Sequence, residues 1–134
     1  MIIKQKFITR DDVRKNKDTH IYLFGDNIVE IGLGGQAKEM RGEPNTIGIP
    51  TKWRPDMGES SFFNDKDFEE LAKIIWGRFM AANFYKNQGK IIVIPEDGLG
   101  TGLAKLEEKA PKILEFINEC IKLLEDENEK RKSK

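Results

Sequence analysis

Glycine clusters at two places in the chain, and both have the residue types of a phosphate-binding loop. The first cluster spans Gly25–Ala37 and the second spans Gly98–Leu103. Glycine lets the backbone adopt positive φ and approach a ligand closely, and free N–H groups before a helix suit a phosphate. Two such loops on neighbouring strands would hold the two ends of a diphosphate. Either loop taken alone is explained equally well as a tight turn.

The better-known motifs of phosphate and acyl chemistry do not occur. The chain has no Gly-x-x-x-x-Gly-Lys-Ser/Thr, and the second loop lacks the Rossmann Gly-x-Gly-x-x-Gly spacing. No Gly-x-Ser-x-Gly elbow supports a serine hydrolase. With one cysteine, Cys120, and one histidine, His20, the sequence predicts no metal site and no cofactor. Cys120 lies on an apolar helix face, where we expect a buried, inert thiol.

Length and charge limit the classes of protein that fit. The 134 residues, 38% of them hydrophobic, suit one domain with a modest core. Lys+Arg and Asp+Glu are 23 each, so no overall basic field would attract nucleic acid or an anionic membrane. No signal-peptide pattern and no long apolar run occur, and we expect a soluble cytoplasmic protein. We expect a single domain over residues 1–124 and a charged, frayed end over residues 125–134.

Apolar periodicity predicts alternating strands and helices. Expected strands are Ile2–Ile8 at a sheet edge, Ile21–Phe24, Thr46–Ile49 ended by Pro50, and Lys90–Ile94. Expected helical segments are a turn within Arg10–Lys17, Gln36–Met40, a helix capped by Asp65 and ending near Asn87, and one starting near Glu107. The alternation predicts an α/β fold of three layers, with a central mixed sheet flanked by helices. Ligands bind beyond the carboxyl ends of the strands in such folds.

Three- and four-residue spacing of apolar side chains predicts the buried faces of the two long helices. The first face is Phe68, Leu71, Ala72, Ile75, Phe79 and Met80, and the second is Ile113, Leu114, Ile117, Cys120, Ile121 and Leu124. Between the third strand and the first of these helices, Trp53–Asp65 is expected to be an ordered loop.

The two glycine loops together resemble those of the macrodomain family. Gly25-Asp26-Asn27, followed by Gly32-Leu33-Gly34-Gly35-Gln36-Ala37, resembles the pattern in which an Asn-containing strand end leads to a Gly-Gly-x-Ala helix start. Ile94–Leu103 looks like the later phosphate-binding loop of that family. The resemblance covers about Ile21–Leu124 and implies a small macrodomain-like fold.

This resemblance implies that the chain binds ADP-ribose or a related nucleotide. The first loop would lie along the distal ribose, and the second would wrap the diphosphate. An ADP-ribosylated macromolecule is a candidate partner, and the oligomeric state is open. The implied ligand-binding residues are Asp26, Asn27, Gly34, Gly35, Gln36, Thr51, Gly98, Leu99, Gly100, Thr101, Gly102 and Leu103.

A further likeness concerns catalysis. Ile49-Pro50-Thr51-Lys52 resembles a strand end in the terminal ADP-ribose protein glycohydrolase branch, where a lysine attacks the anomeric carbon. The resemblance implies that role for Lys52, which would require a pKa lowered by burial or by a nearby positive charge. The alternative is a solvent-exposed lysine that merely follows a strand.

The chain departs from that branch at its acidic residue. The branch has Gly-Leu-Asp-x-Leu, whereas Gly102–Leu106 carries Ala104 at the position of the acid. Asp26, Glu96 or Asp97 would then have to supply an acid–base group. Asp97 lies closest to the second loop and is the predicted catalytic acid, although it fits equally well as a turn residue.

Recognition of the base is left open. Asp11 and Asp12 lie in the region where macrodomains bind the adenine amine, and Trp53, Phe62 and Phe63 would either stack on a ring or plug the core. Three hypotheses remain: an ADP-ribosyl hydrolase, a non-catalytic module for ADP-ribose-derived or cyclic nucleotides, and a protein in which the glycines are only turns.

Overall fold

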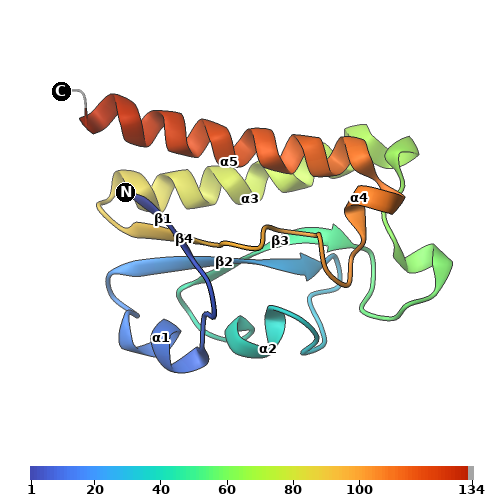
Figure 1. The fold of residues 1–134 in the computed structure, drawn as a ribbon, viewed down its shortest axis with the longest axis horizontal. Coiled ribbons are helices and arrows are strands. Elements are labelled where there is room, and N and C mark those ends of the chain that lie inside the picture. Colours follow the sequence, from blue (N-terminus) through green and yellow to red (C-terminus); the bar gives the residue numbers. More distant parts are fainter. Residues whose placement is uncertain (133–134) are drawn as a thin grey trace.

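The computed structural model describes residues 1–132, and side chains as far as Glu125. The strands of its sheet lie in the order β1-β4-β2-β3 and are β1 (Ile2–Gln5), β2 (His20–Asn27), β3 (Thr46–Lys52) and β4 (Ile91–Pro95). The helices are α1 (Arg10–Lys15), α2 (Ala37–Met40), α3 (Phe68–Asn87), α4 (Leu106–Lys109) and α5 (Pro111–Lys132). Helices α3 and α5 cover one face of the sheet, and α1 and α2 lie on the other (Figure 1). The predicted three-layer α/β fold is confirmed.

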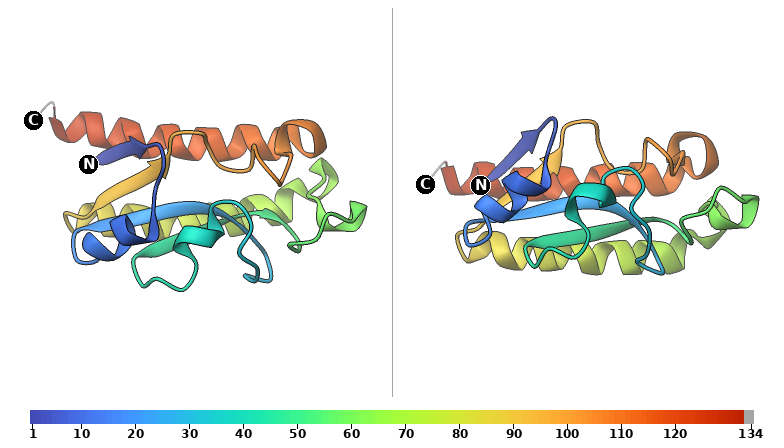
Figure 2. Two further views of the ribbon diagram at one scale, coloured as in Figure 1. Left: turned by 60° about the horizontal axis from the view of Figure 1, so that its bottom comes forward. Right: turned by 90° about the horizontal axis from the view of Figure 1, so that it is seen from below.

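The sheet itself is parallel rather than mixed. All three strand pairs, β1–β4, β4–β2 and β2–β3, are parallel. Among the described residues, the one antiparallel pairing is an isolated bridge between Lys52 and Phe62. Parallel neighbours require a crossover connection, and α2 supplies it between β2 and β3. In consequence, all carboxyl ends, and the loops after them, gather at one edge of the sheet (Figures 1 and 2).

Strand β2 shows why the central strands read as continuous apolar runs. Leu23 packs in the core beneath α3 and α5, whereas Tyr22 and Phe24 pack in the second core with Val13 and Met40 of α1 and α2. A strand buried on both faces has no polar side to alternate with. The predicted strand is confirmed, and it extends further, through Asn27.

The prediction that Pro50 ends its strand is wrong. Strand β3 continues through Pro50 to Lys52, and Pro50 pairs in register with Asp26. Because β3 is an edge strand, a residue without an N–H group is tolerated there. The extension places Thr51 and Lys52 inside the sheet, where both side chains are buried.

The buried face of the last helix is confirmed. Ile113, Ile117, Cys120, Ile121 and Leu124 are buried in the core, and Leu114 is partly buried against it. Burial raises the pKa of the Cys120 thiol to about 11, in keeping with an inert thiol. The charged end expected over residues 125–134 is helical as far as position 132, and residues 133–134 lie outside the described residues. No helix in the described part combines the length and apolarity that a membrane span requires.

The predicted face of α3 is partly wrong. Leu71, Ile75 and Phe79 are buried as expected, but Met80 is 47% exposed. The buried row continues instead through Ala82, three residues beyond Phe79. Helix α3 therefore has large apolar side chains on its inner and its outer sides.

Asp65 caps a different helix from the one predicted. Its carboxylate accepts hydrogen bonds from the backbone N–H groups of Lys112 (3.1 Å) and Ile113 (3.2 Å), at the start of α5. The N-cap of α3 is Asp67, whose side chain makes no capping hydrogen bond. Asp65 thus links the loop before α3 to the N-terminus of α5.

We expect Asp65→Ala to lower the free energy of unfolding by about 1 kcal/mol, because two N–H groups at the start of α5 lose their acceptor. Urea denaturation measures the change. Asp67→Ala is the matched control, since it removes an aspartate that makes no cap bond, and it should cost only a few tenths of a kcal/mol. A larger loss for Asp67→Ala than for Asp65→Ala would contradict the assignment.

Candidate functional site

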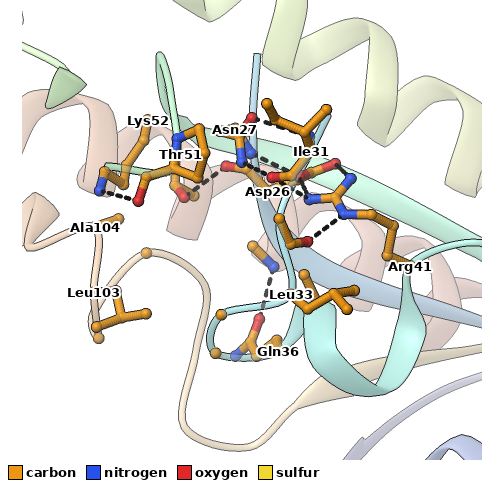
Figure 3. A pocket seen from close by; sticks show the side chains of 18 residues that line it. Asp26, Asn27, Ile31, Leu33, Gln36, Arg41, Thr51, Lys52, Leu103 and Ala104 are labelled. Carbon is orange, nitrogen blue, oxygen red and sulfur yellow. Dashed lines mark hydrogen bonds and ion pairs between the residues drawn. The ribbon is translucent and has the colours of Figure 1, made fainter. Parts of the chain in front are cut away.

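A cavity of about 210 Å³ opens at the carboxyl ends of β2 and β3, between the two glycine loops (Figure 3). Segments far apart in the sequence form its walls, because the parallel sheet brings the carboxyl ends of their strands together. The predicted site residues that line it are Asp26, Asn27, Gly34, Gly35, Gln36, Thr51, Lys52, Gly100, Gly102 and Leu103.

Four predicted site residues do not line this cavity. Leu99 is fully buried in the core, and the Gly98 carbonyl is bonded inside the protein. The Thr101 hydroxyl donates to the Asp97 carbonyl at 2.9 Å, so the loop closes on itself there. The Asp97 side chain is exposed and lies at a separate recess. The structure therefore does not bring the predicted catalytic acid Asp97 to the cavity that contains Lys52.

The side chain of Gln36 ties the two loops together. Its Oε1 accepts from the backbone N–H of Gly25 at 2.7 Å, and its Nε2 donates to the carbonyl of Gly98 at 2.9 Å. Gln36 is one of the predicted ligand-binding residues. In the structure its amide is used by the protein, and its effect is to hold the cavity walls at a fixed separation.

Backbone N–H groups form much of the cavity wall. Those of Gly34, Gly35, Gly100 and Gly102 donate to no acceptor within the described part of the chain. Gly100 is buried, with φ +85°, and an added Cβ would lie 2.3 Å from Cδ1 of Leu106. Buried N–H groups are almost always paired. Gly34, Gly35 and Gly102 are exposed, so water can pair their N–H groups, whereas the buried N–H of Gly100 is the one that calls for an acceptor.

Polar side chains around the cavity hold the first loop in place. The Arg41 guanidinium pairs with both carboxylate oxygens of Asp26 and donates from Nε to the carbonyl of Gly32 at 2.6 Å. The Asn27 amide donates to the carbonyl of Ile31 at 2.8 Å, so it is engaged with the loop rather than open toward a ribose. Sequence reasoning missed Arg41. The sequence signal that could have identified it is the position of this arginine, directly after the short helix that follows Gly34 and Gly35.

Lys52 is a buried lysine and not the exposed one of the alternative reading. Its side chain is 5% exposed, its Nζ donates to the carbonyl of Asp56 at 2.6 Å, and the Phe62 ring centroid lies 4.6 Å away. Burial lowers the pKa of Lys52, and the Lys105 charge lowers it further, whereas Asp56 acts in the opposite direction. The direction of this shift is the one that a lysine nucleophile requires.

The aromatic residues left open by the sequence are part of the core. Phe62 and Phe63 are 7% and 1% exposed, and Trp53 meets Phe63 edge to face at 5.3 Å. Asp12 forms a capping box with Thr9 at the start of α1. The hydrogen bond from the Thr9 backbone is the main cause of a lowered pKa of Asp12. In this structure all four are structural.

A second recess of about 280 Å³ adjoins the cavity and shares Gly35 and Gln36 with it. Phe7 stands at this recess, 83% exposed and with φ +55°. Glu96 and Asp97, both exposed, also line it. Left-handed φ is rare for a bulky residue, and such strain often marks a functional position.

The charges of the cavity favour an anion. Its charged side chains are Asp26, Arg41 and Lys52. Asp26 and Arg41 neutralise each other as a pair, which leaves Lys52 and the unpaired N–H groups. Among the described residues, no group of three or more His, Cys, Asp or Glu side chains is arranged to hold a metal ion.

We expect Arg41→Ala to lower the free energy of unfolding by about 3–5 kcal/mol, because it leaves the buried Asp26 carboxylate without its cation. Arg54→Ala is the control. The Arg54 guanidinium is half exposed and lies 3.6 Å from Asp56, so its loss should cost less than about 1 kcal/mol. Urea denaturation compares the two, and equal losses would contradict a clamping role for Arg41.

Comparison with known proteins gives one match. The model of a family of unknown function, DUF7831, matches residues 3–120. Neither the curated proteins nor the solved structures give a match. The matched residues include both glycine loops and all strands except the first residue of β1. The chain belongs to the DUF7831 family.

Proposed function

We propose that the chain binds ADP-ribose or a related nucleotide diphosphate in the cavity between the two glycine loops. One observation carries this proposal: Gly34, Gly35, Gly100 and Gly102, whose N–H groups have no acceptor among the described residues, line a common cavity whose walls Gln36 holds together. Fixed N–H donors from two loops suit the several oxygens of a diphosphate. The resemblance of both loops to macrodomain loops supports the same ligand, while the family match carries no activity.

The second recess supports a ligand with a base as well as phosphates. Neither recess reaches the roughly 300–1,000 Å³ that is usual for ligand pockets, since they measure about 210 and 280 Å³. Gly35 and Gln36 line both recesses, so one elongated ligand that fills both would have to pass over these two residues. The exposed ring of Phe7 offers a stacking surface for a base, and Glu96 and Asp97 offer acceptors for a ring amine.

We expect calorimetric titration to show micromolar binding of ADP-ribose, with weaker binding of AMP, which lacks the diphosphate, and of ribose 5-phosphate, which lacks the base. Gly34→Glu should weaken ADP-ribose binding more than tenfold, because the carboxylate would enter the anion site. The backbone of Gly34 is not left-handed, and an added Cβ would meet only Cδ1 of Leu103, at 3.3 Å. The variant should therefore fold.

Asn118→Glu is the matched control for this experiment. Asn118 is exposed on α5, and the substitution adds the same charge away from both recesses. ADP-ribose should therefore bind this variant as it binds the unchanged protein. If Gly34→Glu folds and still binds ADP-ribose, the site is misplaced. If no nucleotide gives heat or a thermal shift, the proposal fails, and the glycine loops are turns.

A second candidate function, removal of ADP-ribose from a carrier, is favoured by Lys52. This lysine lines the cavity, is buried, and has a lowered pKa. Two features favour binding without turnover. Ala104 stands where the glycohydrolase branch has its acid, and the one carboxylate in the cavity, Asp26, is paired with Arg41.

If the chain is a hydrolase, we expect it to release ADP-ribose from an ADP-ribosylated peptide, and Lys52→Ala to abolish release while ADP-ribose still binds. Release should increase with pH, because the neutral amine attacks, and should level off below the ordinary lysine pKa of 10.5, since burial lowers the pKa of Lys52. Lys109→Ala is the control, as it removes a lysine whose Nζ lies 5.2 Å from the centroid of the same Phe62 ring but which does not line the cavity. Tight binding with no release by the unchanged protein would instead identify a binding module.

A further inference from the structure

The outer side of α3 carries an exposed apolar stripe. Trp76, Met80 and Phe84 follow each other at four-residue spacing and are 42%, 47% and 58% exposed. Residues at this spacing lie on one side of a helix. The opposite side of α3 already buries Leu71 and Ile75 in the core. Packing within the chain thus accounts for the inner side of α3. On the outer stripe, the Phe84 ring meets its neighbour Tyr85 edge to face at 5.6 Å, and all three side chains remain exposed.

Gly77 lies next to this stripe in the interior of α3. Glycine is among the least favourable residues inside a helix, so its presence there calls for a local reason. An added Cβ would meet no atom within 4 Å, and φ is outside the left-handed region. The chain's own conformation and packing therefore do not require glycine at this position. A glycine on an open helix face allows another backbone to approach closely.

The stripe is symmetric about Met80. Trp76 and Phe84 lie four residues before and after it, so two antiparallel copies of α3 crossing at Met80 would place Trp76 of one copy beside Phe84 of the other. A twofold axis uses the same patch on both copies in this way. Large aromatic residues and methionine are also the types enriched in the centres of protein interfaces.

The charges at the two ends of α3 fit the same arrangement. Its N-terminal end exposes two acidic side chains, Glu69 and Glu70, and one basic side chain, Lys73. Lys90, whose Nζ also donates to the carbonyl of Asp18, follows its C-terminal end. Antiparallel pairing about Met80 brings the acidic end of each helix to the basic end of the other. Opposite charges placed in this way fix the register of an interface.

The middle of α3 adds no charge that would oppose this pairing. From position 74 to the end of the stripe, the one charged residue is Arg78. Its guanidinium pairs with the Glu30 carboxylate of the same chain at 2.7 Å. The centre of the proposed contact is therefore apolar.

We propose that the outer side of α3 is the interface of a homodimer, in which two copies of this chain pair their α3 helices antiparallel across Met80. Stable interfaces bury about 800 Å² on each partner, and the proposed contact is centred on three exposed side chains. The expected dimer is therefore weak, with a dissociation constant in the micromolar range. The interface uses no residue of the glycine-loop cavity.

Sedimentation equilibrium from about 1 to about 500 µM tests this proposal, a range that brackets a micromolar constant. We expect the unchanged protein to form a dimer, and Met80→Glu to raise the dissociation constant more than tenfold, because the two new carboxylates would face each other at the axis. Leu123→Glu is the matched control. Leu123 is 50% exposed on α5, outside the stripe, so that variant should dimerise normally.

Gly77→Ala separates an interface from a merely tolerated glycine. Alanine favours the helix, so the thermal midpoint of the dilute monomer should rise in either case. Under the proposal the same variant dimerises more weakly, because its methyl group keeps the two helices apart. Unchanged dimerisation of Gly77→Ala would count against close approach at this position.

Cysteine cross-linking locates the axis. Met80→Cys should form a disulfide-linked dimer under mild oxidation, since the two copies of residue 80 would face each other, whereas Leu123→Cys should not. The native Cys120 is buried and free, and should not compete. A monomer at every concentration, a dimer that Met80→Glu leaves intact, or cross-linking through Leu123→Cys alone would overturn the proposal. A chain that stays monomeric alone and uses this face of α3 to bind a different protein would also overturn the proposal.

Discussion

The two hydrogen bonds of the Gln36 side chain are the constraint on which the site depends. One amide accepts from Gly25 at the end of β2 and donates to Gly98 after β4. A carboxylate of the same length offers no donor, and an apolar side chain offers neither group. At Gly25 itself an added Cβ would lie 3.4 Å from Oε1 of Gln36 and 3.6 Å from N of Gly100, which are ordinary van der Waals distances, so the two hydrogen bonds and not the absence of a side chain hold the loops together.

The polar side chains of Arg41 and Asn27 beside the cavity likewise make their hydrogen bonds within the protein. Arg41 holds Asp26 and the Gly32 carbonyl, and Asn27 holds the Ile31 carbonyl. Each of these contacts fixes part of the first loop. The backbone N–H groups of Gly34 and Gly35, which lie in this loop and have no acceptor among the described residues, are consequently held in place. Donors that need no reorganisation bind an anion at a lower entropic cost than mobile side chains do.

The sequence predicts the layers and the loops well because both depend on local signals. The apolar run at Ile21–Phe24 needs only its own residues to indicate a strand buried on both faces. The failures depend on partners distant in sequence. Pro50 is tolerated because β3 forms the sheet edge, Asp65 caps a helix 47 residues away, and Arg41 is placed by its pairing with Asp26. Local sequence patterns cannot predict these contacts, because each depends on a residue or strand distant in the sequence.

The contacts of the Lys52 ammonium group bear on whether this lysine could act as a nucleophile. Its ammonium group donates to the carbonyl of Asp56 and lies against the Phe62 ring. Both contacts favour the charged form, whereas burial and Lys105 favour the neutral amine. Nucleophilic attack would require the amine to leave the Asp56 carbonyl and turn into the cavity. The proposed binding of a diphosphate requires no such movement, because the glycines whose N–H groups lack an acceptor already line the cavity. The resting geometry therefore fits the proposed binding better than the proposed catalysis, which would need a shift of the Pro55–Met57 segment.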